Sequence, residues 1–133
     1  MIKGHCECGS IQFEADSDIS DYSHCHCSQC RRLHGAAFAT FAGVQRDRFH
    51  YLSGESDLTT YASSHNHNRV FCSVCGSNIG VDLADYPDEF YVSMSAIDGD
   101  PPRPEGYHIY VGSKAPWYEI NDSLKQYDAD APD

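Results

Sequence analysis

The sequence has few basic residues. Lysine and arginine together number 9, against 20 aspartate and glutamate residues, which gives a formal net charge of −11 and a pI near 4.9. A protein surface of that sign repels phosphate backbones and anionic lipid headgroups. The charge balance therefore argues against a role in binding nucleic acid or a membrane surface.

Long hydrophobic runs are also missing. No stretch approaches the roughly 20 consecutive apolar residues that a transmembrane helix needs. The N-terminal segment Met1–Cys6 lacks the basic-then-apolar pattern of a secretory signal. We therefore expect a cytoplasmic protein, whose cysteines are free, catalytic or bound to metal rather than paired as disulfides.

A long amphipathic helical pattern is absent too. Short β-rich segments alternate instead with turn residues, which is typical of an all-β domain. The expected strands cover residues 10–15, 21–24, 37–41, 49–52, 58–61, 69–71, 89–94 and 107–111. One short helical turn is expected from Ser28 to Leu33, ended by Gly35. We predict a single domain over residues 1–126, followed by an acidic, disordered tail over residues 127–133.

The cysteines are the most informative residues of the chain. All seven fall into three clusters: Cys6 and Cys8; Cys25, Cys27 and Cys30; and Cys72 and Cys75. Cysteines that merely fill a core would not cluster in this way, so the spacing indicates metal binding. Two pairs and one triplet suggest a division into four ligands and three.

The two pairs fit a closed tetrahedral site. Cysteine thiolates suit zinc, and Cys6, Cys8, Cys72 and Cys75 supply the four ligands that a structural zinc site requires. Gly9 and Gly76 follow the second cysteine of each pair, where a sharp turn with positive φ is expected. The binding energy of this ion, on the order of 10 kcal/mol or more, would be folding energy.

The triplet Cys25, Cys27 and Cys30 is one ligand short of four. An open fourth position distinguishes catalytic zinc sites from structural ones. A histidine could instead complete the site, and His24, His26 and His34 are near in sequence. His26 is the least suited, because in an extended Cys-x-Cys its side chain points away from both neighbours. An iron–sulfur cluster is a weaker alternative, because three cysteines are an incomplete ligand set for one.

The motifs together resemble a known family. They are Cys6-x-Cys8-Gly9, Cys25-His26-Cys27-x-x-Cys30-Arg31, Phe71-Cys72-x-x-Cys75-Gly76, and the closing stretches His108-Ile109-Tyr110 and Lys114-Ala115-Pro116-Trp117-Tyr118. In this order they are similar to the glutathione-dependent formaldehyde-activating enzyme family, also called the centromere-protein-V-like family. The resemblance spans about residues 3 to 120.

The resemblance implies a fold, two metal ions and a reaction. The fold is the Mss4-like β-tent, in which short antiparallel strands are held together by zinc. Two zinc ions per chain are implied, a structural one at the four-cysteine set and a substrate-facing one at Cys25, Cys27 and Cys30. The implied activity is that of a carbon–sulfur lyase that joins formaldehyde to glutathione as S-hydroxymethylglutathione.

The chemistry of an open zinc suggests further site residues. A thiol entering the fourth position would lose its proton and attack formaldehyde, and the product alkoxide would need a proton. His26 is one candidate donor, and His24, His34 and His108 are others; each is otherwise a surface or core histidine.

Three further residues are candidates for binding glutathione. Arg31 and Arg69 could clamp its carboxylates, although both would serve equally well as solvated charges. Trp117, the single tryptophan, could line the pocket or belong to the core. The alternative function is a non-catalytic β-tent module in which both zinc ions are structural and the surface binds a protein partner.

Overall fold

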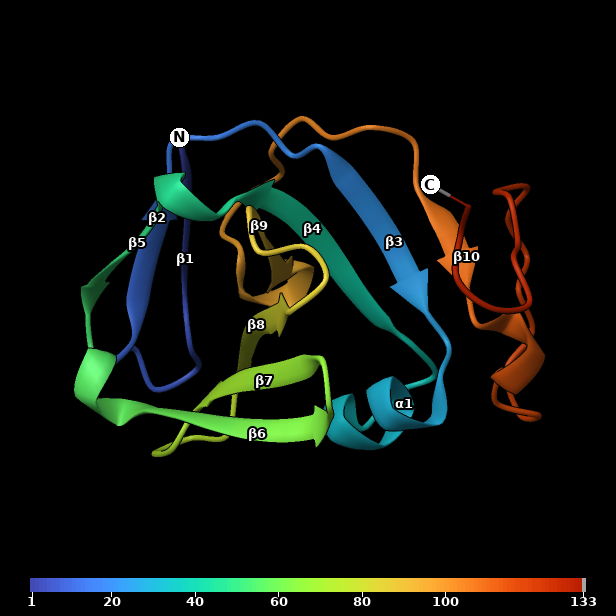
Figure 1. The fold of residues 1–133 in the computed structure, drawn as a ribbon, viewed down its shortest axis with the longest axis horizontal. Helices are drawn as coiled ribbons and strands as arrows, with labels where there is room; N and C mark the ends of the chain where they lie inside the picture. Colours follow the sequence, from blue (N-terminus) through green and yellow to red (C-terminus); the bar gives the residue numbers. More distant parts are fainter. Residues whose placement is uncertain (133) are drawn as a thin grey trace.

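The computed structural model describes residues 1–132 and contains two β-sheets (Figure 1). The small sheet has the order β1 (Ile2–His5), β2 (Gln12–Ala15) and β5 (Phe49–Ser53). The large sheet has the order β10 (Tyr107–Ile109), β3 (Asp21–Cys25), β4 (Ala39–Gln45), β9 (Glu89–Ser93), β8 (Asn78–Leu83), β7 (His67–Cys72) and β6 (Leu58–Ser64). The predicted all-β fold is confirmed.

Helical structure is limited to short pieces. The α-helix α1 (Ser28–His34) is accompanied by the 3-10 turns η1 (Arg46–Arg48), η2 (Glu55–Asp57), η3 (Met94–Ala96) and η4 (Val111–Ser113). Gly35 ends α1 in the left-handed conformation (φ 59°), as the sequence predicts. Within residues 1–132 no helix has the length and the apolar content that crossing a membrane requires.

One strand pair departs from the expected antiparallel arrangement. β10 lies parallel to β3, with His108 opposite His24 and Ile109 opposite Cys25, whereas the other paired strands are antiparallel. Parallel neighbours need a long connection, and almost the whole domain is built between β3 and β10. This pairing brings the closing His108-Ile109-Tyr110 stretch beside the three-cysteine motif.

Aromatic rings join the two sheets. Phe49 of β5 packs against Phe90 of β9 with ring centroids 4.6 Å apart, and against Phe13 of β2 at 5.1 Å. All three rings are buried, and Ile79, Val44 and Val92 of the large sheet lie in the same core. Burial of apolar area at this junction is the main force that holds the sheets together.

The strands β1 and β8 were not predicted, and both contain glycine. Glycine weakens a strand pattern because it offers no side chain to pack. At Gly80 in β8 a Cβ atom would lie 2.6 Å from the ring of Phe90, so the close approach of the core ring requires glycine there. Packing of a core ring over the neighbouring strand of the same sheet therefore explains a residue that sequence periodicity penalises.

The C-terminal segment is not the disordered tail that the sequence suggests. The amide of Tyr127 donates to the carbonyl of His108 (2.9 Å), and the amide of Tyr110 donates to the carbonyl of Ala129 (3.0 Å). β10 is the edge strand of the large sheet, so its outer backbone groups are free to receive these bonds. The backbone of an acidic segment with few large apolar residues can be ordered in this way. Asp133 lies outside the described residues.

Candidate metal centres and substrate cavity

The two cysteine pairs meet in one cluster. The sulfur atoms of Cys6, Cys8, Cys72 and Cys75 all lie within 4.8 Å of one another, with Cys6 and Cys8 sulfurs 3.5 Å apart and Cys8 and Cys72 sulfurs 3.8 Å apart. Four sulfurs around a tetrahedral zinc at about 2.3 Å would be separated by about 3.8 Å. The donor set and its spacing therefore fit a closed metal site.

Two turns of similar geometry position these cysteines. The amide of Cys6 donates to the carbonyl of Ile11 (3.1 Å), and the amide of Cys72 donates to the carbonyl of Ser77 (2.9 Å). Gly9 and Gly76 sit at the sharp point of each turn with φ of 80° and 79°, which confirms the expected conformation. A Cβ atom at either position would meet nothing within 4 Å, so the backbone angle is the reason for glycine there.

The four-cysteine cluster joins distant parts of the chain. Cys6 and Cys8 lie between β1 and β2 of the small sheet, whereas Cys72 and Cys75 lie at the turn between β7 and β8 of the large sheet. Cys6 and Cys72 are buried, and Cys8 and Cys75 are exposed. The Ser77 side chain, followed by backbone amides, lowers the pKa of Cys75 to about 5. A metal held here would link the two sheets.

The second cluster is built at the start of α1. Cys25 ends β3, Cys27 caps the helix by accepting a hydrogen bond from the amide of Cys30 (3.3 Å), and Cys30 lies buried in the first turn. Hydrogen bonds from Cys25 and Cys30 lower the pKa of the Cys27 thiol to about 2, and the hydrogen bonds to its neighbours raise that of Cys25. Cys27 therefore carries the first negative charge of the cluster, whereas Cys25 and Cys30 hold their protons more tightly and would release them on metal binding.

No histidine completes this cluster to four ligands among residues 1–132. His24 Nδ1 lies 2.8 Å from the hydroxyl of Thr40, and His34 packs edge-on against Phe41 with ring centroids 5.6 Å apart. His26 Nε2 lies 2.7 Å from His108 Nδ1. None of the three histidines that could have served as a fourth ligand therefore joins the three sulfur atoms.

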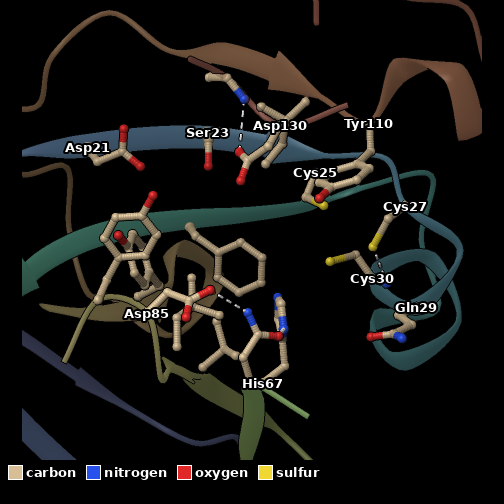
Figure 2. Close-up of a pocket in the computed structure, with 18 of the residues that line it drawn as sticks. Asp21, Ser23, Cys25, Cys27, Gln29, Cys30, His67, Asp85, Tyr110 and Asp130 are labelled. Atoms are coloured by element: carbon tan, nitrogen blue, oxygen red, sulfur yellow. Dashed lines mark hydrogen bonds between the residues drawn. The ribbon is translucent and has the colours of Figure 1, made fainter. Parts of the chain in front are cut away.

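The three cysteines lie on the wall of a cavity of about 670 Å³ (Figure 2). Apolar side chains of Phe41, Val81, Leu83 and Ile109 and the tyrosines Tyr86, Tyr91, Tyr107 and Tyr110 also line it. The C-terminal residues Asp130, Ala131 and Pro132 close one side. A cavity of this size is typical of a small-molecule site.

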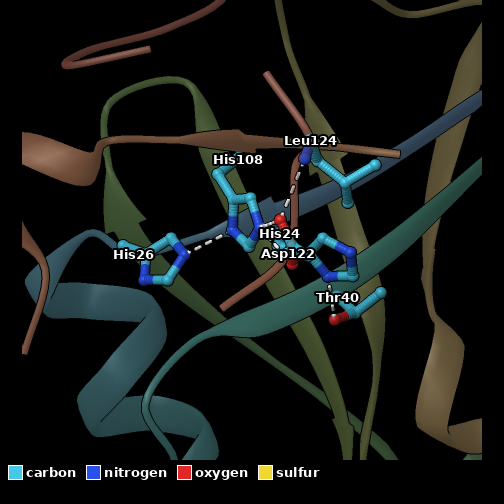
Figure 3. A network of polar contacts seen from close by, with 6 residues as sticks. All are labelled: His24, His26, Thr40, His108, Asp122 and Leu124. Atoms are coloured by element: carbon cyan, nitrogen blue, oxygen red, sulfur yellow. Dashed lines mark hydrogen bonds and ion pairs between the residues drawn. The ribbon is translucent and has the colours of Figure 1, made fainter. Parts of the chain in front are cut away.

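The histidines of the motif lie on the other face of the strands. Asp21, Ser23 and Cys25 alternate along β3 toward the cavity, so His24 and His26 point to the opposite side. There His26, His108 and Asp122 form a chain of contacts, with His108 Nε2 3.0 Å from a carboxylate oxygen of Asp122 (Figure 3). His26 and His108 are buried and do not reach the cavity wall.

Of the three candidate substrate-binding residues, Arg69 lines the cavity and the other two do not. Arg69 lines the cavity and is only 4% exposed. Its guanidinium donates to Cys30 Sγ (3.4 Å), to Ser63 Oγ (3.1 Å) and to the side-chain oxygen of Gln29 (3.4 Å). Arg31 and Trp117 are not among the described residues that line the cavity, and Trp117 is 69% exposed. The geometry gives these two no contact with a molecule bound there.

Tyr110 is a site residue that the sequence reasoning missed. It lines the cavity beside Cys25 (Figure 2) and adopts a left-handed backbone conformation with φ 56°. Burial, followed by the charges of Asp130 and the three thiols, raises the pKa of its phenol. A tyrosine with positive φ is uncommon and often marks a functional position. Its place directly after His108-Ile109 in the closing motif was the available signal.

Comparisons with known proteins agree with this architecture. The model of the family described as glutathione-dependent formaldehyde-activating enzyme matches residues 1–113. A Halomonas elongata protein named "Putative glutathione-dependent formaldehyde-activating enzyme" is 29% identical over 136 residues, covering 90% of this chain and 81% of the relative. An uncharacterized lyase of Schizosaccharomyces pombe is 22% identical over 128 residues, covering 96% of this chain and 91% of the relative.

A solved structure is also similar. The crystal structure of a Rhodobacter sphaeroides protein superposes with a TM-score of 0.64 at 27% identity, covering 75% of this chain and 91% of the other. The family match extends from β1 through β10 and includes both cysteine clusters. The chain belongs to the glutathione-dependent formaldehyde-activating enzyme family.

Proposed function

We propose that this protein is a zinc-dependent carbon–sulfur lyase-type enzyme that adds a small thiol of the glutathione kind to formaldehyde or a related carbonyl compound. The observation that carries the proposal is the group formed by Cys25, Cys27 and Cys30. It lies on the wall of a substrate-sized cavity, and no further ligand within residues 1–132 completes it. The names of the family and of the two relatives support the same reaction class.

The two clusters have different roles in this proposal. Cys6, Cys8, Cys72 and Cys75 hold a structural zinc ion, because four thiolates close the coordination sphere. Cys25, Cys27 and Cys30 hold the catalytic ion. Zinc bound by three cysteinates supplies one kind of chemistry, the lowering of an incoming thiol's pKa so that its sulfur can attack the formaldehyde carbon.

Other residues of the chain offset the charge of the cysteine cluster and shield the reacting atoms from water. Arg69 donates to Cys30 Sγ and offsets part of the negative charge of the thiolate cluster. A carbon–sulfur bond forms, the carbonyl double bond becomes a single bond, and the proton lost by the thiol is returned to the carbonyl oxygen. The four apolar side chains on the cavity wall exclude water from the reacting atoms.

Tyr110 is the proposed proton donor. Its phenol lies on the cavity wall beside Cys25, and an ordinary tyrosine keeps its proton at neutral pH. The amide and the carbonyl of Tyr110 are both hydrogen-bonded, to Ala129 and Ser113, so its unusual backbone conformation is fixed. Of the histidines considered as donors, His24, His26 and His108 lie behind the strand, and His34 is not among the described residues that line the cavity.

Titration of cobalt-substituted protein with glutathione tests the proposal. Cobalt reports its ligands in the visible spectrum, and the four-cysteine cluster has no position for an added thiol. We expect glutathione to change the spectrum of the wild type and to leave that of a Cys27→Ser variant unchanged. A wild-type spectrum that glutathione does not change would contradict the proposal and favour the binding-module alternative.

A further inference from the structure

The cavity beside the three cysteines is lined by more acidic than basic residues, which is unusual for a site that binds an anionic thiol such as glutathione. Its acidic lining residues are Asp21, Asp85, Glu89 and Asp130, and Arg69 is the single lysine or arginine among the described lining residues. Glutathione has two carboxylates and one ammonium group. The lining therefore offers many partners to a cation and few to a carboxylate.

Arg69 already forms hydrogen bonds with other residues of the protein. All three of its guanidinium nitrogens donate hydrogen bonds, to Ser63, Cys30 and Gln29, and its side chain is almost fully buried. His67, the other basic lining residue, has Nδ1 2.6 Å from Asn66 Oδ1, and burial, followed by the charge of Arg69, lowers its pKa. His67 is therefore neutral at physiological pH, so the buried Arg69, which already donates from all three nitrogens, is the one cation of the described lining that a carboxylate could meet.

The four carboxylates have only neutral partners. Asp21 accepts from the phenol of Tyr107 (2.6 Å), Glu89 from the phenol of Tyr91, Asp85 from the amide of Asn66 (2.9 Å) and Asp130 from the backbone amide of Ala131 (2.9 Å). Within the described part of the chain none of the four forms an ion pair with lysine or arginine. Their charges therefore act on whatever occupies the cavity.

Three of these carboxylates are close enough to repel one another. Burial raises the pKa of Asp21, and the charges of Glu89 and Asp130 raise it further. Asp130 lines the same cavity as the three cysteines, so its carboxylate and the cysteine cluster face the same bound molecule. Figure 2 shows Asp21, Ser23 and Asp130 along the wall that leads to Cys25. A cationic group there would relieve this repulsion.

We propose that this cavity favours a thiol that carries an ammonium group over a similar thiol that carries only a carboxylate, and that Asp21 and Asp130 determine this preference. The inference rests on the proposed function, because the three cysteines and the cavity define the site. The carboxylates on its wall set which charge the site accepts. An aminothiol places its sulfur at the cysteine cluster and its ammonium group against the acidic wall.

The charges of the metal cluster, the cavity wall and the whole chain act on a ligand in the same direction. Three cysteinates around a divalent zinc ion carry a net formal charge of −1, and an incoming thiolate makes this charge more negative. A carboxylate on the same small molecule would add to this repulsion, whereas an ammonium group would offset it. The net charge of −11 on the whole chain acts in the same direction.

Three small thiols of similar size test this specificity. Cysteamine is cationic, 2-mercaptoethanol is neutral and 3-mercaptopropionate is anionic. Each is titrated into cobalt-substituted protein at neutral pH, and the change in the cobalt spectrum gives an apparent Kd. The ratio of the 3-mercaptopropionate Kd to the cysteamine Kd is compared between the wild type and the Asp21→Asn/Asp130→Asn variant. The intrinsic thiol pKa values differ among the probes, but they contribute equally to both proteins.

We expect the Kd ratio to fall about tenfold in the variant, because two charges facing the ligand have been removed. The control is Asp47→Asn, which removes an exposed carboxylate outside the cavity and should leave the ratio unchanged. Equal Kd ratios in the wild type and the double variant would overturn the inference while leaving the proposed function intact. A wild-type spectrum that none of the three thiols changes would overturn both.

Discussion

His26 and His108 lie ring to ring, with His26 Nε2 2.7 Å from His108 Nδ1 in a fully buried contact. One of these nitrogens must donate and the other accept. The carboxylate of Asp122 accepts from His108 Nε2 at 3.0 Å, which leaves His108 Nδ1 to contact His26 Nε2. The contact joins the cysteine motif at the end of β3 to β10 and the C-terminal segment.

Removal of the His108 ring should destabilise this junction. His108→Ala leaves His26 Nε2 without a partner and opens a cavity between the rings of His26 and Phe38, at a cost of about 3 kcal/mol in the free energy of unfolding. Denaturant unfolding measures the change. The control His65→Ala removes an exposed ring and should change stability by less than about 0.5 kcal/mol. Equal stability of the two variants would show that the buried contact contributes nothing.

The two cysteine clusters should respond differently to a single Cys→Ser change. Cys72 is fully buried in the cluster that joins the two sheets, and its metal contributes folding energy on the order of 10 kcal/mol, so Cys72→Ser should unfold the domain. Cys27→Ser should leave a folded protein with one zinc ion in place of two. Elemental analysis and circular dichroism of the purified variants measure both outcomes. A Cys27→Ser protein that retains both ions would refute the four-plus-three division.

Much of the metal chemistry was predictable because it depends on local spacing. Cys25, Cys27 and Cys30 are close in sequence, so they are close in any fold. Gly9 and Gly76 were correctly assigned positive φ because the turn after a Cys pair requires it. The alternation of side chains along an extended segment also placed His26 away from its cysteine neighbours.

The cavity depended on long-range pairing that no local pattern specifies. Arg69 and Tyr110 reach the three cysteines only because β7 and β10 are positioned by the large sheet. Asp130 belongs to a segment whose composition predicts disorder, and it lines the cavity because the edge of β10 binds the backbone of that segment. Trp117 was a plausible pocket residue by type, but it lies largely in solvent.

Tyr110→Phe tests the proposed proton donor. The substitution keeps the ring and removes the phenolic oxygen, so the metal content and the glutathione-induced change in the cobalt spectrum should be those of the wild type. Loss of a general acid typically lowers a rate by 10² or more, and we expect kcat to fall about 100-fold. The matched control is Tyr61→Phe, which removes an exposed phenol on β6 outside the cavity. A kcat equal to that of the control variant would exclude Tyr110 as the donor.

Asp21→Asn should stabilise the protein in a pH-dependent way. Burial, followed by the charges of Glu89 and Asp130, raises the pKa of Asp21 above its value in the unfolded chain. The folded state then binds a proton more tightly than the unfolded state, so the contribution of Asp21 to stability is present in acid and is lost as the pH rises through the folded-state pKa.

Asparagine removes this dependence and still accepts the hydrogen bond from Tyr107 through its amide oxygen. The free energy of unfolding of Asp21→Asn relative to the wild type should therefore increase as the pH rises from about 4, near the ordinary pKa of aspartate, to about 8, as measured by denaturant unfolding at both values. Metal release in acid affects both proteins and cancels in the difference. The control Asp47→Asn, an exposed carboxylate of η1, should show a difference that does not change with pH. A difference for Asp21→Asn that is equally constant would mean that the cavity wall does not hold Asp21 in a repulsive field.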